Sequence, residues 1–425
     1  MSRLPMRRAN LLLVSGIVAL SISGCGGGTA SPSAGVSAAQ SATAASPSAI
    51  ASTSPSASPR PNGVFSTTGL MVVEQQIEAT STLLADGRVL VTGGENYQED
   101  EQLKSAEIYE SATGLWSMTG SMKNGRTWHT ATLLKDGKVL VAGCGDADSA
   151  AELYNPGTGK FTSTGSMVSD STCLSTATLL PDGRVLLAGG FDFYKASKSA
   201  EIYDPATGKF TATGSLHTAR ENAQAVLLAD GRVLIIGGCQ APYTRERETD
   251  LASAEIYDPA TGEFTPTGSM GTARDNFSAT ALNDGTVLVA GGDTVKATGS
   301  KSLVERAETQ YASAEIYDPA TGKFRPTGSM HTQRGGNSDF YAIGEITPWT
   351  ALYSGLLPDG RVLILGGDGL NDRHGTGEIY DPATGKFASA PSVPLLDPSP
   401  YLIPAVTLKD GRVLIPGAPS LLYTP

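Results

Sequence analysis

The sequence predicts an all-β fold in which a unit of four antiparallel strands repeats seven times. A Leu-x-Asp-Gly-(Arg/Lys/Thr)-Val-Leu motif occurs seven times, with its aspartates at Asp86, Asp136, Asp182, Asp230, Asp284, Asp359 and Asp410. Six copies are followed by (Ala/Gly)-Glu-(Ile/Leu)-Tyr, with its glutamates at Glu107, Glu152, Glu201, Glu255, Glu315 and Glu378. A period of about 50 residues built from short strands is typical of radial and solenoidal arrays.

The composition fits a chain with many turns and excludes two classes of partner. The 425 residues include 50 glycines, and 17% of the residues are charged. The net charge is −11, and no basic run occurs after residue 8. Nucleic acids and anionic membrane surfaces are bound by clustered Lys and Arg. We therefore expect no nucleic acid as a partner, and contact with a membrane only through a lipid anchor.

Residues 1–24 have the pattern of an export signal. Arg3, Arg7 and Arg8 precede an apolar stretch at 11–22, which is shorter than the roughly 20 apolar residues that span a bilayer. The stretch ends in Ile-Ser-Gly-Cys, which resembles the lipobox of bacterial lipoproteins. This resemblance implies cleavage before Cys25, lipidation of its thiol and attachment to the cell envelope. The alternative is a plain secretory signal with a chance cysteine, and both interpretations predict an exported protein.

Residues 25–62 are predicted to form a flexible tether. They are almost entirely Gly, Ser, Ala, Thr and Pro, and they show no apolar pattern from which a core could form. Residues 63–425 remain for the repeats.

The unit around residue 200 shows why these residues predict strands. Four short runs, strands a to d, are expected at 177–180, 184–188, 200–203 and 210–213. The a–b turn contains Asp182 and Gly183, and the c–d turn runs from Asp204 to Gly208, with the residues that tight turns prefer. One such sheet cannot bury both of its faces, so successive sheets must pack face to face around an axis.

Two parts of the repeating unit resemble the kelch repeat: the Gly-Gly (or its equivalent) after strand b, and Tyr-Asp-Pro-x-Thr-Gly-x-(Phe/Trp) between strands c and d. Kelch repeats form blades, so the resemblance implies a seven-bladed β-propeller of four-stranded antiparallel blades. The last unit has only strands a to c, at 406–423, whereas residues 65–71 match strand d at 161–167. The N-terminal strand 65–71 is therefore expected to join the C-terminal blade and close the ring, which leaves no open edge.

Variation in length is confined to one face of this ring. The a–b and c–d turns share a face, here called the turn face, whereas the b–c loops and d–a connections share the loop face. The b–c loops lie at 95–105, 145–150, 191–199, 239–253, 293–313 and 368–376, and a long d–a connection lies at 331–353. Diverse loops on a rigid scaffold commonly bind ligands, so the loop face is the predicted binding surface. The alternative is that insertions are merely tolerated in solvated loops.

Twelve residues of the d–a connections are candidates for ligand binding. They are Arg126, Trp128, His129, Arg220, Asn222, Arg274, Asn276, Arg334, Asp339, Phe340, Tyr341 and Trp349. Arginine beside amides and aromatic rings suits carboxylates, acidic peptides or sugar hydroxyls at the mouth of the central channel. The alternative, that each recurring arginine stabilises a neighbouring blade, stays open. The recurring Glu of strand c is expected to form an ion pair or hydrogen bond within its blade, and the recurring Tyr and Phe to pack in the core.

The propeller resemblance also suggests a copper-radical oxidase of the galactose oxidase type. That chemistry implies a site of two His and two Tyr, but His129, His217, His331 and His374 lie in four different blades. The segment 368–372 has oxygen ligands near Ca²⁺ spacing but lacks the bidentate Glu, so a polar turn is expected there. No metal and no cofactor are predicted.

Cys144 and Cys173 both fall on the loop face, one blade interface apart, in a chain predicted to be exported. Disulfides persist in such compartments, so we predict a Cys144–Cys173 bond and a free Cys239.

These features predict a monomeric, non-catalytic binding propeller that recognises an extracellular protein or glycan through its loop face. A carbohydrate-active or oxidative enzyme that uses the same face is the first alternative. A structural component of the envelope, whose propeller only assembles with partners, is the second.

Overall fold

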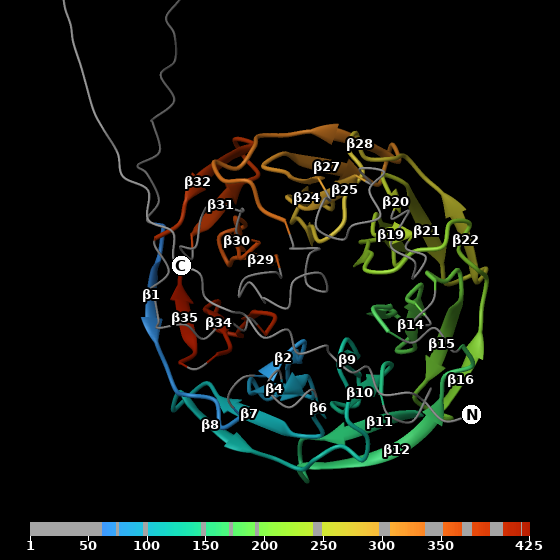
Figure 1. Cartoon of the computed structure of the whole chain (residues 1–425), viewed down its shortest axis with the longest axis vertical. Helices are drawn as coiled ribbons and strands as arrows, with labels where there is room; N and C mark the ends of the chain where they lie inside the picture. Colours follow the sequence, from blue (N-terminus) through green and yellow to red (C-terminus); the bar gives the residue numbers. More distant parts are fainter. Residues whose placement is uncertain are drawn as a thin grey trace, which may run out of the picture. The chain divides into compact units, whose positions relative to one another are not determined.

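The computed structural model describes twelve stretches of the chain, which all belong to one compact unit, Pro59–Pro425. These stretches are 62–73, 76–96, 101–145, 150–169, 173–191, 195–240, 249–296, 307–335, 352–367, 376–391, 403–417 and 419–425. Seven four-stranded antiparallel sheets form a ring, as Figure 1 shows. The seven-bladed β-propeller predicted from the repeats is confirmed. The predicted signal peptide, the lipidation site at Cys25 and the tether up to residue 61 lie outside the described residues.

Each blade runs from strand a near the axis to strand d at the rim. Blades 1 to 3 are β3 (Thr80–Leu83), β4 (Val89–Thr92), β7 (Ala106–Glu110) and β8 (Leu115–Met118); β9 (Thr130–Leu133), β10 (Val139–Ala142), β11 (Ala150–Asn155) and β12 (Lys160–Ser166); and β13 (Thr176–Leu179), β14 (Val185–Ala188), β15 (Ala200–Asp204) and β16 (Lys209–Ala212). Blades 4 and 5 are β17 (Gln224–Leu227), β18 (Val233–Ile236), β21 (Ala254–Asp258) and β22 (Glu263–Pro266); and β23 (Ser278–Ala281), β24 (Val287–Ala290), β27 (Ala314–Asp318) and β28 (Lys323–Pro326). Blades 6 and 7 are β29 (Tyr353–Leu356), β30 (Val362–Leu365), β31 (Gly377–Asp381) and β32 (Lys386–Ser389); and β33 (Val406–Thr407), β34 (Val413–Ile415), β35 (Leu421–Thr424) and β1 (Val64–Thr67).

The N-terminal strand closes the ring as predicted. β1 pairs antiparallel with β35, and Phe65 lies opposite Tyr423. The strand ends at Thr67, earlier than the predicted residue 71. The chain then leaves blade 7 for blade 1, because the Thr68 amide donates to Ser420 O and the Gly69 amide donates to Gly114 O, each at 2.9 Å. The two ends of the propeller therefore hold each other in one sheet, in which β1 is the outer strand of blade 7.

The a–b turns owe their shape to the repeated Asp-Gly pair. In blade 3, Oδ1 of Asp182 accepts a hydrogen bond from the Arg184 amide at 2.9 Å. Gly183 has a φ of +95°, which glycine adopts without the steric cost that a Cβ would add. Local sequence thus specifies a tight hairpin in every unit, which keeps the turn face uniform.

The core consists of layers between blades. Buried apolar side chains form seven clusters among the described residues, and each cluster joins two adjacent blades. Between blades 4 and 5, for example, Leu234 and Ile236 of β18 pack with Val287 and Val289 of β24. Each β-sheet is covered on both faces, which explains why the b strands are continuously apolar.

The recurring Tyr of strand c links each blade to the preceding one. Tyr203 packs on Phe210 of its own blade with the ring centroids 4.8 Å apart, and its hydroxyl lies 2.9 Å from Thr164 Oγ1 of blade 2. The same hydroxyl pair recurs at Thr68–Tyr109, Thr119–Tyr154, Thr213–Tyr257, Thr267–Tyr317 and Thr327–Tyr380, at 2.8–3.0 Å. The predicted core role of this Tyr is confirmed, and its hydroxyl adds a polar contact between blades.

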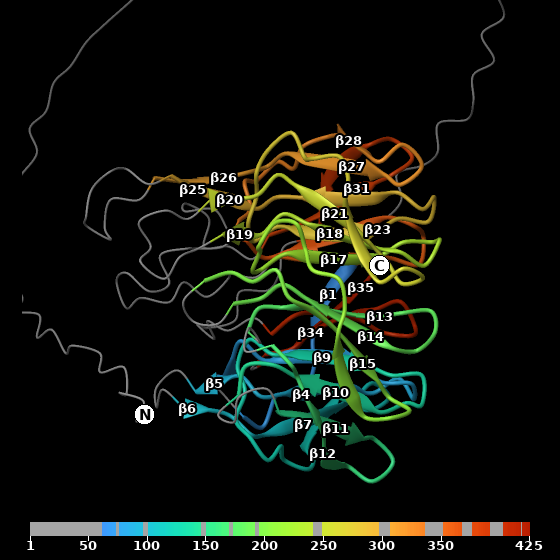
Figure 2. The same ribbon diagram turned by 90° about the vertical axis from the view of Figure 1, so that its right-hand side faces the viewer.

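Additional short strands extend the loop face. They are β2 (Gln76–Ile77), β5 (Glu95–Asn96) and β6 (Glu101–Gln102), the hairpin of β19 (Cys239–Gln240) and β20 (Thr249–Asp250), and the hairpin of β25 (Asp293–Lys296) and β26 (Ala307–Gln310). Figure 2 shows β5, β6, β19, β20, β25 and β26 on the same side of the ring. Three of the variable b–c loops thus project from one face, as predicted. No helix of the described stretches combines the length and apolar character that crossing a membrane requires.

Candidate functional site

The four recurring arginines are buried between blades. Arg126, Arg220, Arg274 and Arg334 have 0–1% of their surface exposed. In blade 4 the Arg220 guanidinium donates to Gly237 O at 2.8 Å, to Ser253 O at 3.1 Å and to Glu255 Oε1 at 3.0 Å. The Arg220 carbonyl accepts from the Gly190 amide of blade 3 at 2.9 Å. Each arginine therefore connects two blades.

The same contacts recur in blades 2, 5 and 6. Arg126 lies 3.6 Å from Glu152, Arg274 lies 3.2 Å from Glu315, and Arg334 lies 3.6 Å from Glu378. Of the two roles considered for these arginines, burial and bonding favour the structural one, since no guanidinium is accessible to a ligand. We therefore assign them to blade contacts in place of ligand binding. The expected structural role of the strand-c Glu agrees with these ion pairs.

A ring of left-handed residues surrounds the loop-face end of the a strands. Each lies two residues before its strand: Glu78 (φ +58°), Trp128 (+47°), Leu174 (+51°), Asn222 (+53°) and Asn276 (+50°). Asn tolerates this conformation, whereas for Trp and Leu it is strained. Residues with strained backbone conformations cluster at functional sites, so this repeated position is a candidate for one. Three of these residues, Trp128, Asn222 and Asn276, are predicted ligand-binding residues, and all five are half-buried.

Asn222 and Asn276 belong to a cluster of polar side chains at the interface of blades 4 and 5, here called the blade 4–5 cluster. Its members are Glu221, Asn222, Cys239, Asp250, Asp275, Asn276 and Asp293. Asn222 Nδ2 donates to Asp275 Oδ1 at 2.9 Å and to Asn276 Oδ1 at 2.8 Å. Asn276 Nδ2 in turn lies 3.3 Å from both carboxylate oxygens of Asp293. The amides therefore link the carboxylates into one network.

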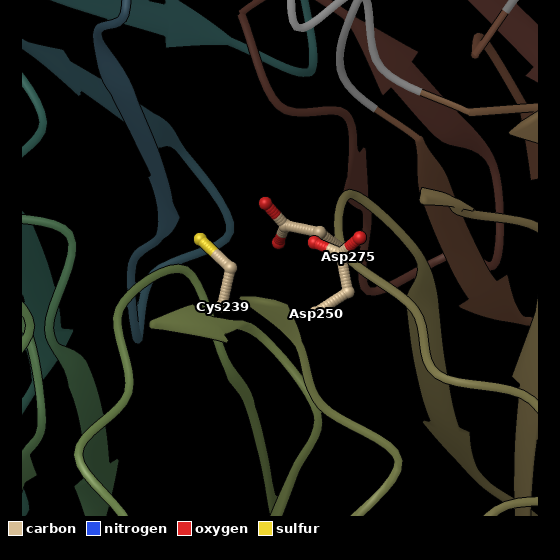
Figure 3. A group of neighbouring side chains, drawn as sticks. All are labelled: Cys239, Asp250 and Asp275. Atoms are coloured by element: carbon tan, nitrogen blue, oxygen red, sulfur yellow. The ribbon is translucent and has the colours of Figure 1, made fainter. Parts of the chain in front are cut away.

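Three side chains of the blade 4–5 cluster bring ligand atoms close together. The Sγ of Cys239 and carboxylate oxygens of Asp250 and Asp275 all lie within 4.8 Å of one another. Figure 3 shows Cys239 and Asp250 on the β19–β20 hairpin and Asp275 beside them on a separate segment. Cys239 is buried, whereas Asp250 and Asp275 are half-buried. Among the described residues, this is the group that could hold a metal ion.

The blade 4–5 cluster holds one carboxyl group, that of Asp275, with a raised pKa. Burial, together with the negative charge of Asp250, raises the pKa of Asp275 to about 7, although hydrogen bonds from the Asn276 amide, Cys239 and Asn222 oppose this shift. Asp275 is thus partly protonated near neutral pH and can either donate or accept a hydrogen bond. Carboxylates and amides with both capacities suit ligand hydroxyl groups.

A second polar group lies at the interface of blades 1 and 2. Thr127 Oγ1 donates to Glu78 Oε2 at 2.7 Å. Burial raises the pKa of Glu78 to about 7, and Glu95 adds to this effect, whereas hydrogen bonds from Thr127 and Trp128 oppose it. A half-buried indole beside a carboxyl group provides an apolar surface next to a polar one, which is an arrangement suited to ligand binding.

The histidines of the described residues do not form a common site. His129 is buried, and its Nε2 lies 3.0 Å from the hydroxyls of both Thr80 and Thr92. Burial, together with Arg126, lowers its pKa to about 3, so the ring is neutral. His217 and His331 have exposed rings and lie 3.1 Å and 2.8 Å from the glutamates of their own blades. His374 lies outside the described residues, as do Asp339, Phe340, Tyr341 and Trp349 and the segment 368–372.

A disulfide joins Cys144 to Cys173, as expected, and Cys239 forms no disulfide with the described cysteines. Cys144 follows strand b of blade 2, and Cys173 precedes strand a of blade 3. The sequence has Thr172 at the position where four other blades have arginine. The disulfide therefore links two blades at an interface that lacks the recurring arginine.

A cavity of about 550 Å³ opens between a–b turns on the opposite, turn face. Leu227, Leu228, Ala281 and Val287 contribute to its lining. Its charged residue, Asp230, is already bonded to Arg232. Because selective recognition requires several polar groups that point inward, the loop-face clusters are better candidates than this cavity.

Sequence reasoning missed most of the blade 4–5 cluster. It identified Asn222 and Asn276 from their place in the repeat and did not select the five other members, of which Cys239, Asp250 and Asp293 occur in no recurring polar motif. One pattern in the sequence could have pointed to the acidic members. The run Arg-(Glu/Asp)-Asn occurs at 220–222 and 274–276, in two adjacent blades, and places an acidic residue directly before each predicted asparagine.

Comparison with known proteins supports the fold. Residues 173–216 and 224–271 match the family described as the kelch motif. The structure resembles a fungal alcohol oxidase of the AA5 family determined in complex with copper, with a TM-score of 0.63 and 17% identity over 86% of this chain and 76% of that one. It also resembles YjhT, with a TM-score of 0.54 and 14% identity over 75% of this chain and 98% of that one. No curated protein matches. At these identities the likeness concerns the fold, and the chain is a seven-bladed β-propeller with kelch motifs.

Proposed function

We propose that this protein is a non-catalytic binding propeller that recognises an extracellular glycan or protein through its loop face. The observation that carries the proposal is the blade 4–5 cluster, in which amides and carboxylates of two blades lie at 2.8–3.3 Å from one another. Asn222, Asp275 and Asn276 are half-buried and Asp293 is buried. A ligand at the loop-face end of the a strands would meet the three half-buried groups together. The turn face, in contrast, repeats one hairpin in every blade.

The charge of the cluster narrows the class of ligand. Glu221, Asp250, Asp275 and Asp293 are acidic, and the nearby Arg274 is already paired with Glu315. An acidic ligand would therefore meet repulsion, although acidic peptides were considered on the basis of the arginines. Hydroxyl-rich ligands avoid this cost, because amide and carboxyl groups can both donate to and accept from sugar hydroxyls. Within the proposal we favour a glycan over an acidic protein segment.

The proposal is tested with an array of neutral and amino-sugar oligosaccharides and the labelled full-length protein. The test variant is Asn222→Gly/Asn276→Gly, because glycine keeps the left-handed backbone while removing both amides. Asn283→Gly is the matched control, since Asn283 is exposed in an a–b turn on the turn face. We expect the double variant to weaken binding at least about tenfold, equivalent to about 1.4 kcal/mol, and the control to leave it unchanged.

Equal binding by all three proteins would contradict a loop-face site and would favour a structural envelope component. The enzyme alternative rests on the likeness of fold to an oxidase. The same array distinguishes it, because release of hydrogen peroxide or of a cleaved sugar would show turnover.

A further inference from the structure

Blade 3 has a position that other blades fill with a positive charge. In blade 4 the Arg220 guanidinium occupies a site formed by Gly237 O, the carbonyl and hydroxyl oxygens of Ser253, and Glu255. Arg274 repeats these four contacts in blade 5, and Arg126 and Arg334 occupy the corresponding place in blades 2 and 6. The sequence has threonine, residue 172, at the matching position of blade 3.

The acceptors that bind the guanidinium are nevertheless retained in blade 3. Glu201 pairs with Leu187 in the register that Glu255 has with Ile235 in blade 4. Gly189 and Ser199 correspond in the same register to the Gly and Ser of blade 4. All three of these blade 3 residues line a small cavity of about 10 Å³. A cavity of this volume is about large enough for a single particle of the size of a water molecule.

Polar side chains contribute to the lining of this cavity together with the apolar residues Met167, Leu187 and Ala200. Besides Glu201, its lining includes the hydroxyls of Ser169, Ser175 and Ser199. Ser169 Oγ lies 2.9 Å from Ser199 Oγ. Ser175 Oγ is buried and has no hydrogen-bond partner in the described part of the chain. A buried hydroxyl without a partner costs free energy, so its presence beside a cavity points to a group that fills the space.

The carboxylate of blade 3 also lacks the charge balance of its counterpart. Glu201 is 2% exposed and accepts hydrogen bonds from the amides of Val168 at 2.7 Å and Ser169 at 2.5 Å. Burial raises its pKa above the ordinary value despite these two bonds. For Glu255, burial acts in the same direction, but two backbone amides and Arg220 together lower the pKa below the ordinary value. The two environments differ chiefly by the guanidinium.

We propose that the blade 3 cavity binds one monovalent cation of the size of Na⁺ or K⁺, held by Glu201 and by the oxygens of Gly189, Ser175 and Ser199. Hard cations prefer oxygen ligands, and buried carboxylates are normally paired with a positive charge. One carboxylate balances one positive charge, and the cavity is too small for a larger organic cation. The ion would take the electrostatic role that arginine has in the neighbouring blades.

The test is the thermal unfolding of the full-length protein in NaCl, KCl and choline chloride at equal ionic strength and pH 7.5. Choline is too large for the cavity, so it serves as the reference. When Na⁺ or K⁺ exceeds its Kd about tenfold, the expected rise in Tm is roughly 2 °C. Glu201→Gln should abolish the rise. Glu255→Gln is the matched control in a blade that has its arginine, and it should retain the rise.

Two further measurements keep the test decisive if a variant folds poorly. Line broadening of ²³Na by the protein should be present in the wild type and lost in Ser199→Ala, which retains the carboxylate. Arg220→Met should create a second vacant position and increase the difference in Tm between NaCl and choline chloride. An equal Tm in all three salts, or a rise that survives in Glu201→Gln, would overturn the proposal and leave water or a protonated Glu201 in the cavity.

Discussion

Replacing Arg274 with methionine should lower the free energy of unfolding by about 3 kcal/mol. Arg274 is 0% exposed, and its guanidinium donates to Gly291 O at 2.6 Å, to Ser313 O at 3.0 Å and to Glu315 Oε1 at 3.2 Å. Methionine removes the guanidinium donor from these acceptors and leaves Glu315 buried without its cation. Removing one member of a buried ion pair costs about 3–5 kcal/mol. We expect the lower end, because Glu315 keeps a 2.7 Å hydrogen bond from the Gly271 amide.

The assay is equilibrium unfolding of the full-length protein in urea, followed by circular dichroism. Arg325→Met is the matched control, since Arg325 is exposed on β28 and its loss should change stability by less than about 0.5 kcal/mol. The double variant Arg274→Met/Glu315→Gln removes the buried charge and should recover at least about 1 kcal/mol of the loss. A single variant within about 1 kcal/mol of the wild type, or a double variant no more stable than the single one, would refute the reasoning.

Three other perturbations have defined outcomes. Burial raises the pKa of Glu78 from 4.5 to about 7. The protonated Glu78 therefore stabilises the folded state below pH 4.5, and this contribution is lost as the pH rises through about 7. Glu78→Gln should remove this pH dependence of the stability, together with the accompanying change in Trp128 fluorescence. Reducing the Cys144–Cys173 disulfide, which closes a separation of 29 residues, should lower stability by about 3–4 kcal/mol in urea titrations, and an unchanged midpoint would contradict its role between blades. Tyr317→Phe should cost about 1 kcal/mol, because it removes a 2.8 Å hydroxyl contact to the preceding blade while keeping the ring; a loss above about 3 kcal/mol would mean that packing is also disturbed.

The repeated turns made the fold predictable. Asp182 and Gly183 specify a hairpin through local hydrogen bonding and a positive φ, and the same pair occurs in every unit. The ring closure was predictable for the same reason, since residues 65–71 carry the pattern of a d strand. The end of that strand at Thr67 was not, because it depends on contacts with Ser420 and Gly114 of two other blades.

The candidate site was predictable only in part. The place of Asn222 and Asn276 in the repeat put them near the channel mouth, and the structure places them together. Arg220 and its counterparts were predicted to bind a ligand for the same reason, their place in the repeat. Their guanidinium groups instead form the contacts between blades. The repeat in the sequence shows that a residue recurs. Whether its side chain is exposed or buried depends on the hydrogen-bond acceptors that other segments place beside it.

The sequence by itself determined the number of blades, the order of their strands, the face on which the loops vary and the cysteines that pair. These properties follow from short-range turn chemistry and from the repetition of one pattern. Tertiary structure alone decided which polar residues meet, because Asp275 approaches Cys239 and Asp250 from a separate segment. It also decided their charge balance, because Glu201 lacks the arginine that pairs with Glu152, Glu255, Glu315 and Glu378. Burial and charge balance are properties of the assembled ring, and they arise only where neighbouring blades meet.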